Sequence, residues 1–439
     1  MKNDIFEVIR ALLERSGADA YEVTEERETG WEFYFIRHKL DQNRAKDVTT
    51  LKIKVFKKSD DGKFLGNATG DVPPTASKDE IEKLISDLVY QASLVKNPYY
   101  ELNGLKEAGV EDGDDPNQEA LVEVDIEKMA EDFIETLNAI PETATEDLNS
   151  YEIFVSKKEK HFINSNGIDQ RTSYPKAMIE VVTNARHESK EIELYRIYNR
   201  GTCDRAALTQ DIVEVLNMGR DRLEAVPTPH LKEAPLILST QDSVWMFDYF
   251  FDRMNASYKY RGFSDWEIGK PIADDVKGDK ITITAVPMLP NSSRNYPFDE
   301  EGAKIKEKVL IRDNIPENYW GGRQFSQYMG LEDSSNVYNY KIEGGSKSAE
   351  EIRKGPYIEV VEFSGFDCDA ITGDIAGEIR LGYYHDGEKI IKVTGGSVSG
   401  SMRDLAKEMY LSKELRQYDF ALVPAVVRLE HATIAGIEG

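Results

Sequence analysis

Apolar residues recur at helical spacing in the first third of the chain. The clearest stripe follows the capping box Ser77-Lys-Asp-Glu80, with apolar positions at i, i+3, i+4, i+7, i+8 and i+11: Ile81, Leu84, Ile85, Leu88, Val89 and Ala92. Similar stripes over 5–13 and 126–140 end at Gly17 and Pro141. The pattern predicts three amphipathic helices, each with one face for a core.

Aromatic and β-branched runs predict strands on both sides of the third helix. Residues 51–56 alternate apolar side chains with Lys, and Asp60-Asp61-Gly62 then has the composition of a hairpin turn. From about residue 148 strand patterns dominate, with a Lys-rich turn expected between 155 and 161. The predicted strands are 31–36, 51–56, 63–66, 151–155, 161–163, 178–182 and 192–197.

The composition changes near residue 230. Pro227, Pro229 and Pro235 mark a linker that follows a long helix predicted over 204–224. Beyond this linker, strands and long loops rich in Gly, Ser and Asn predominate.

Two further helices are predicted in this second half, at 240–255 and 403–415. Helices and runs of strands are segregated along the chain and do not alternate regularly, which is typical of the α+β class. We therefore expect an N-terminal domain, 1–230, with amphipathic helices packed on β-structure. A β-rich C-terminal domain is expected over 231–439.

Composition limits the class of protein. The chain has 439 residues, of which 40% are hydrophobic, so a sizeable core is expected despite a net charge of -25. Such acidity disfavours contact with nucleic acids and anionic membranes, and no apolar run approaches the length of a membrane span. The first ten residues lack the apolar core of a signal peptide. The sequence predicts a cytoplasmic protein without direct nucleic-acid binding.

Candidate catalytic residues are scattered. No two of the six histidines lie within five residues of each other, which excludes His-Glu-x-x-His and its relatives. Cys368 stands between two aspartates, which disfavour its thiolate. Asp299-Glu-Glu-Gly302 could hold a hard cation or a peptide N-terminus, although such a triplet is more often an exposed turn. With no zinc site of three ligands apparent, we assign no catalytic and no metal-binding residue.

A series of short segments, in order along nearly the whole chain, resembles the TldD/PmbA family, also described as peptidase U62 and as modulators of DNA gyrase. Residues 55–66 and the helix capped by Ser77 look like that family's N-terminal domain. Further matching segments are Asn164-Ser-Asn-Gly167, Phe263-Ser-Asp-Trp-Glu-Ile-Gly-Lys-Pro-Ile-Ala273, Phe298-Asp-Glu-Glu-Gly302, Ser348-Ala-Glu-Glu-Ile352, Thr372-Gly-Asp374 and Ala432-Thr-Ile-Ala-Gly436.

The family this chain resembles has two branches. One branch carries a His-Glu-x-x-x-His helix that binds the catalytic metal; the other, typified by PmbA (also called TldE), has lost this motif. The equivalent helix here should be 240–255, which contains Asp242, Asp248 and Asp252 but no His. Its apolar residues are expected to fill a core: Val244, Met246, Phe247, Phe250, Phe251 and Met254. The chain therefore resembles the PmbA branch.

The resemblance implies a non-catalytic subunit of a metallopeptidase complex that cleaves small or unfolded peptides in the cytoplasm. It implies a dimer with a TldD-like subunit that bears His-Glu-x-x-x-His, with zinc in that partner and no cofactor in this chain. Two alternatives remain. The chain could itself be a metallopeptidase, or it could be a non-proteolytic modulator of gyrase or a peptide-binding protein. Scattered ligands for the former would come from His161, His187, His385, Cys368 and 299–301.

Overall fold

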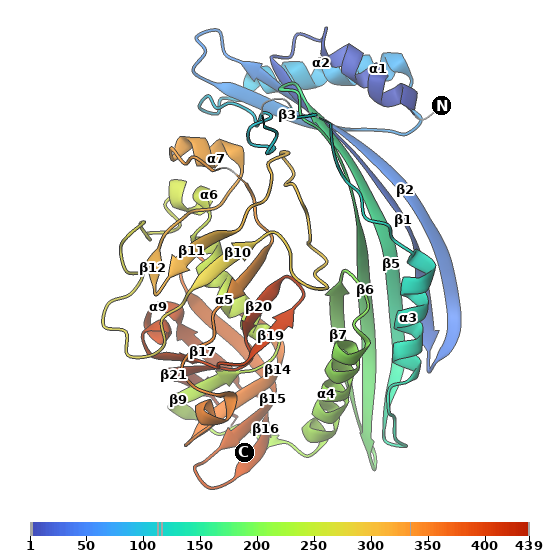
Figure 1. The fold of residues 1–439 in the computed structure, drawn as a ribbon. Coiled ribbons are helices and arrows are strands. Elements are labelled where there is room, and N and C mark those ends of the chain that lie inside the picture. Colours follow the sequence, from blue (N-terminus) through green and yellow to red (C-terminus); the bar gives the residue numbers. More distant parts are fainter. Residues whose placement is uncertain (1–2, 112–113, 116, 334, 438–439) are drawn as a thin grey trace.

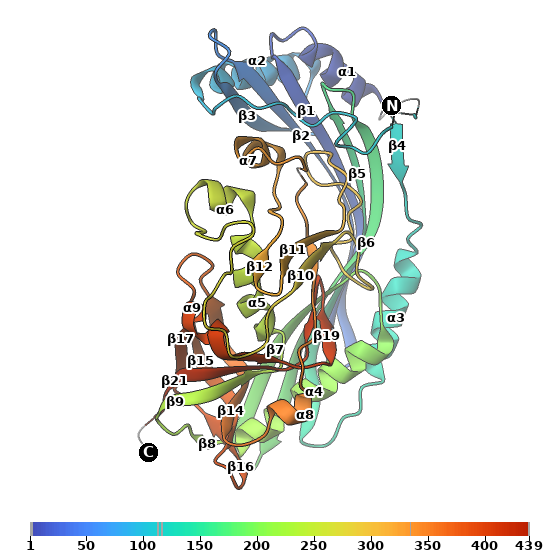
Figure 2. The ribbon, with the colours of Figure 1, turned by 60° about the vertical axis from the view of Figure 1, so that its left-hand side comes forward.

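The computed structural model describes residues 3–111, 114–115, 117–333 and 335–437, and it confirms the α+β class. A long, curved sheet forms one side of the molecule, and a second, β-rich body lies beside it (Figure 1). Turning the molecule shows that the long strands run the height of the structure and that both α1 (Asn3–Leu13) and α2 (Lys78–Leu94) lie at one end of them (Figure 2).

In the described residues, the first half of the chain forms a seven-stranded sheet. The strands are β1 (Ala20–Ile36), β2 (Lys39–Lys58), β3 (Leu65–Val72), β4 (Asn117–Ala120), β5 (Glu146–Asn164), β6 (Asp169–His187) and β7 (Lys190–Arg200). Their order is β3-β2-β1-β5-β6-β4, and β7 also pairs with β6. Pairing is antiparallel except between β4 and β6.

Four helices pack against this sheet, and three of them carry the apolar stripes found in the sequence. α1 and α2 share a core with Ile53 and Val55 of β2. α3 (Ile126–Asn138) and α4 (Arg205–Leu223) share another with Ile153 of β5 and Ile179 of β6. The predicted capping box of α2 is present: the Ser77 hydroxyl accepts from a backbone N–H, and the Glu80 carboxylate accepts from the N–H of Ser77 at 2.7 Å.

The Lys-rich turn predicted between 155 and 161 is wrong, because this segment lies in the middle of β5. The strand is hydrogen-bonded to β1 on one side and to β6 on the other, so its backbone groups are satisfied without a turn. Its lysines meet acidic partners along the sheet: Lys158 lies 2.5 Å from Glu28 and Lys157 lies 2.9 Å from Glu159. Cross-strand pairing therefore overrides the polar composition of the segment.

The described part of the second half contains two further sheets. The six-stranded sheet comprises β10 (Ile283–Val286), β11 (Lys308–Arg312), β12 (Ile315–Pro316), β13 (Asn339–Ile342), β19 (Leu415–Tyr418) and β20 (Ala421–Pro424). The eight-stranded sheet comprises β8 (Val226–Pro227), β9 (Leu231–Leu238), β14 (Tyr357–Cys368), β15 (Asp374–His385), β16 (Ile390–Thr394), β17 (Ser397–Ser401), β18 (Met409–Leu411) and β21 (Val427–Ala435). In the latter, β9 lies between β14 and β21.

The helices of this half are short. They are α5 (Asp242–Arg253), α6 (Ala256–Tyr260), α7 (Arg323–Tyr328), α8 (Ala349–Ile352) and α9 (Met402–Leu405). The helix predicted over 403–415 is wrong, because after α9 and a single 3-10 turn the chain pairs as β18 with β21. Long-range strand pairing outweighs the local pattern there. Across the described ranges, no helix has the length and apolar character needed to cross a bilayer.

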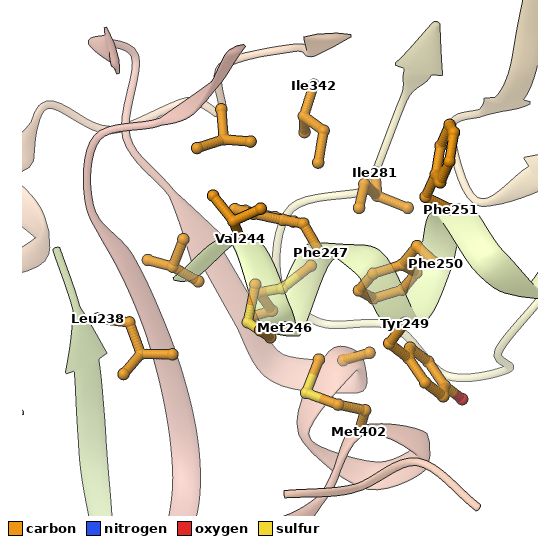
Figure 3. Packing of buried hydrophobic residues seen from close by; sticks show 14 of the residues in the cluster. Leu238, Val244, Met246, Phe247, Tyr249, Phe250, Phe251, Ile281, Ile342 and Met402 are labelled. Carbon is orange, nitrogen blue, oxygen red and sulfur yellow. The ribbon is translucent and has the colours of Figure 1, made fainter. Parts of the chain in front are cut away.

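The helix predicted over 240–255 is confirmed as α5, and it lies inside the core of the second half. All six residues expected to fill that core are at most 7% exposed. Side chains of α5 point toward Leu238, Ile281, Ile342 and Met402, which come from segments far apart in the chain (Figure 3). Core packing on several sides therefore fixes the position of α5.

Contacts made by α4 join the two halves. The Tyr383 hydroxyl on β15 donates to Asp221 at 2.7 Å, and Lys392 on β16 lies 2.8 Å from the same carboxylate. Arg416 on β19 lies 2.7 Å from Asp211. α2 and α3 both lie on the seven-stranded sheet, as expected for one N-terminal unit. The domain boundary near residue 230 stays a prediction.

Candidate functional site

A cavity of about 880 Å³ lies where the two halves meet. It is lined by β7 and α4 from the first half, and by α5, Arg294 and residues of β19 and its following turn from the second. Its volume falls in the range of small-molecule sites, about 300–1,000 Å³. Because both halves build its walls, the cavity exists only in the assembled chain.

α5 has two different sides. Trp245, Asp248 and Asp252 line the cavity, and their spacing of three and four residues places them on one stripe of the helix. Phe247 and Phe250 are buried in the core, 0% and 1% exposed. Trp245, by contrast, is 55% exposed. A helix that is otherwise part of the core therefore presents two carboxylates and an indole to the cavity.

The two carboxylates of this stripe are partly removed from water. Burial raises the pKa of Asp248 to about 7 and that of Asp252 to about 6. The Tyr340 hydroxyl donates a hydrogen bond to Asp248 at 2.8 Å. Among the residues that the structure describes, none donates a hydrogen bond to the side chain of Asp252. Both groups can therefore change protonation near neutral pH, as groups in functional sites often do.

In the acidic triplet 299–301, Asp299 and Glu301 accept hydrogen bonds from backbone N–H groups. The Asp299 carboxylate, 2% exposed, accepts from the backbone N–H groups of Glu301, Ala303 and Asn336, each at 2.9 Å. Burial and Glu301 raise the pKa of Asp299 to about 8, against the lowering effect of N–H donors. The expected exposed turn is thus correct only in part: Asp299 is buried, whereas Glu300 is exposed and lines the cavity.

The scattered histidines are not brought together. His161 on β5 lies 2.8 Å from Asp169 and stacks on Phe6. His385, at the end of β15, stacks on Tyr357, and His187 ends β6. In the described ranges, no group of three or more His, Cys, Asp or Glu side chains could hold a metal ion. The ligand set considered for an independent metallopeptidase is thus spread over different strands.

Cys368 lies at the end of β14, packed against the core around α5. Burial, followed by the charges of Asp367 and Asp369, raises the pKa of its thiol to about 12. The thiol stays protonated at neutral pH, which confirms the disfavoured thiolate expected from the sequence.

The sequence shows only part of this cavity. Asp248 and Asp252 stand in the predicted helix without an expected role, and neither Arg294 nor the exposed Trp245 is predicted to lie beside them. An available signal was the pair of aspartates four residues apart within an otherwise apolar helix, because buried acidic residues are rare unless they have partners. Arg294 reaches the site from a loop between β10 and β11, and only the fold shows that contact.

Residues 232–436 match the family model described as the PmbA/TldA metallopeptidase C-terminal domain. The second half of the chain is thus a domain of metallopeptidase type. Over this domain the chain is similar to the PmbA/TldD family, in agreement with the resemblance of its sequence motifs.

Relatives agree with this assignment. Metalloprotease PmbA of Escherichia coli O157:H7 is 25% identical over 180 residues, which cover 39% of this chain and 39% of that protein. The match thus spans about two fifths of the curated relative. TldE from Thermococcus kodakarensis superposes with a TM-score of 0.73 at 19% identity, covering 98% of this chain and 100% of that one. A candidate modulator of a DNA gyrase from Thermotoga maritima superposes with a TM-score of 0.77 at 15% sequence identity. The superposition covers 99% of this chain and 100% of that one. At these identities the two structures show a shared fold.

Proposed function

We propose that this chain is the non-catalytic subunit of a PmbA/TldD-type metallopeptidase complex that cleaves small or unfolded peptides in the cytoplasm. The observation that carries the proposal is the composition of α5. It has Asp242, Asp248 and Asp252, and no His, at the place of the His-Glu-x-x-x-His helix of the metal-binding branch. Catalytic zinc usually takes three protein ligands and keeps an open position. The proposal therefore assigns zinc to a TldD-like partner.

The packing of α5 supports this assignment. Core contacts occupy one side of the helix, so ligands for an ion in the cavity would have to come from its exposed stripe. That stripe offers the indole of Trp245 and the carboxylates of Asp248 and Asp252. Carboxylates alone are the ligand set of hard cations such as Mg²⁺ and Ca²⁺, whereas zinc favours nitrogen and sulfur.

The names of relatives give further support. The Escherichia coli relative is named a metalloprotease, and TldE of Thermococcus kodakarensis shares the fold over almost the whole chain. In the proposed dimer, this chain supplies walls of the reaction chamber and the TldD-like partner supplies the metal.

The edge of β7 is suited to hold peptide backbone in such a chamber. Five consecutive residues, 196–200, line the cavity, which indicates that the strand's edge faces it, since one face would contribute only alternate residues. Within the described residues β7 pairs only with β6, so its other edge carries no strand. Extended peptides bind open edges of this kind by adding a strand.

The proposal is tested by metal analysis and peptide cleavage with the purified chain. We expect no stoichiometric zinc and no cleavage of an unstructured peptide by the chain alone. Cleavage should appear when a TldD-like protein bearing His-Glu-x-x-x-His is added, and the two should elute together in gel filtration. The matched control is the same partner with its motif histidines replaced, which should still bind this chain but restore no cleavage.

Zinc at one equivalent per chain, together with chelator-sensitive cleavage by the chain alone, would overturn the non-catalytic role. Failure to bind any partner with the motif would instead overturn membership of the complex. The two results are distinguishable, because the first concerns this chain's own chemistry and the second its assembly.

A further inference from the structure

Most charged groups around the cavity already have partners within the fold. Arg200 and Arg416 both contact Asp211, at 2.8 and 2.7 Å, and Arg416 also contacts Glu214. Other lining groups are likewise occupied: Arg196 pairs with Glu362, Tyr338 donates to Glu300, and Ser293 donates to Asp419. These charged groups have partners within the fold, and those of Arg196 and Arg416 also join the two halves.

Two charged groups of opposite sign differ from the rest. Asp252 accepts no side-chain hydrogen bond, and Arg294 forms no ion pair, in the part of the chain that the structure describes. The Arg294 guanidinium lies 3.8 Å from the ring centroid of Phe420, which holds it beside the cavity. Asp248, one helical turn from Asp252, has only the neutral Tyr340 hydroxyl as a hydrogen-bond donor. A carboxylate pair and a guanidinium are therefore left to interact with whatever enters.

Aromatic residues of α5 line the cavity together with its two carboxylates, as does Trp320. Phe251 stacks on Trp320 at 4.7 Å and on Tyr340 at 4.8 Å, and the exposed indole of Trp245 lies on the same helix. Aromatic faces beside carboxylates form a favourable environment for a cationic amine. Arg294, which also lines the cavity, is suited to an anion.

We propose that this cavity binds a free amino acid or short peptide as a zwitterion, with its ammonium group at Asp252 and Asp248 and its carboxylate at Arg294. The charges that the fold leaves unpaired are matched by the two termini of such a ligand. The volume of about 880 Å³ accommodates a molecule of this size. The site is independent of the proposed partner, because all of its groups belong to this chain.

The test is binding of three dipeptides to the purified full chain, measured by calorimetry and by the fluorescence of the cavity tryptophans. Dialanine has both charged termini, N-acetyl-dialanine lacks the ammonium group, and dialanine amide lacks the carboxylate. We expect dialanine to bind with a stoichiometry of one. Each blocked form should bind at least about tenfold more weakly, because one charge-assisted hydrogen bond is lost.

Two variants separate the two ends of the site. Asp252→Asn should weaken dialanine binding at least about tenfold and remove the preference for a free ammonium group, while the preference for a free carboxylate remains. Arg294→Gln should remove the preference for a free carboxylate, while the preference for a free ammonium group remains. Matched controls are Asp60→Asn, in the exposed turn after β2, and Arg171→Gln, exposed on β6, which should bind like the wild type.

Equal affinity for all three dipeptides, or no change in either variant, would overturn the assignment. Absence of dialanine binding at millimolar concentrations would do the same, whether or not the chain proves to be a subunit of a peptidase. Should Asp252→Asn fail to fold, Arg294→Gln decides the question, because Arg294 is exposed and its side chain makes no polar contact in the described residues.

Discussion

Burial raises the pKa of three carboxyl groups in this protein. Asp248, Asp252 and Asp299 have pKa values near 7, 6 and 8, and in each case burial is the largest cause. In the unfolded chain an aspartate ionises near pH 3.8, so the folded protein holds protons that the unfolded chain has released. Each of these groups therefore lowers the free energy of unfolding as the pH rises.

Replacing Asp248 with Asn should show this effect. Between about pH 4 and pH 7 the wild type loses stability from this group, because the folded form retains the proton, and above pH 7 the loss is constant. Asn does not titrate, so Asp248→Asn should gain stability relative to the wild type over that range, by at most about 4 kcal/mol. The measurement is the free energy of unfolding of both proteins, by urea titration, from pH 4 to pH 8.

The control for this experiment is Asp369→Asn. Backbone N–H groups of Thr372 and Ile371 hold the pKa of Asp369 below its usual value, so it titrates below the range tested. The stability difference between Asp369→Asn and the wild type should therefore stay constant from about pH 5 to pH 8, where Asp369 is ionised in both the folded and the unfolded chain. A constant difference for Asp248→Asn as well would contradict a raised pKa at Asp248.

At the scale of elements, α5 shows how one helix serves both core and cavity. Phe247 is fully buried within the largest hydrophobic cluster, whereas Trp245, two residues earlier, is 55% exposed. The two aromatic residues have similar size and lie on the same helix, so they separate the effect of burial from that of residue type.

Phe247→Ala should destabilise the protein by about 3–5 kcal/mol, because it leaves a cavity in the core. Trp245→Ala should cost less than about 1 kcal/mol, because surface substitutions usually have small effects. Both are measured by chemical denaturation at one pH. Similar losses for the two variants would show that the helix is not oriented as described.

The helices and strands differ in how far the sequence alone predicts them. α1, α2 and α3 were predictable because their apolar stripes, and in α2 a capping box, lie within the segment itself. β5 was predicted as two strands and 403–415 as a helix, because the pairing that decides them comes from β1, β6 and β21. Prediction of the cavity is limited in the same way. Asp248 and Asp252 stand together in one predicted helix, whereas only the fold brings Arg294 to the same cavity.

The whole molecule combines two kinds of topology. In the seven-stranded sheet β1 pairs with β2, and β5 with β6, in antiparallel hairpins between neighbours in the chain. In the eight-stranded sheet β9 pairs with β14 and with β21, which come much later in the chain. Contacts between distant segments form slowly, because closing long loops costs entropy.

Refolding of the full chain should therefore protect the two sheets at different times. In a pulse-labelling hydrogen-exchange experiment, amides of β1, β2, β5 and β6 should become protected before those of β9 and β21. Protection of β9 should coincide with that of β21, since each supplies hydrogen-bond partners to the other. Simultaneous protection of both sheets would contradict this order.

The position of β9 also has a consequence during translation. β9 ends at Leu238 and β21 begins at Val427, so the ribosome adds roughly 190 residues between them, which takes about 10–40 s at 5–20 residues per second. During that delay the apolar β9 has emerged, but its antiparallel partner β21 has not been made. We therefore expect chaperones that shield exposed apolar segments to bind the nascent C-terminal half.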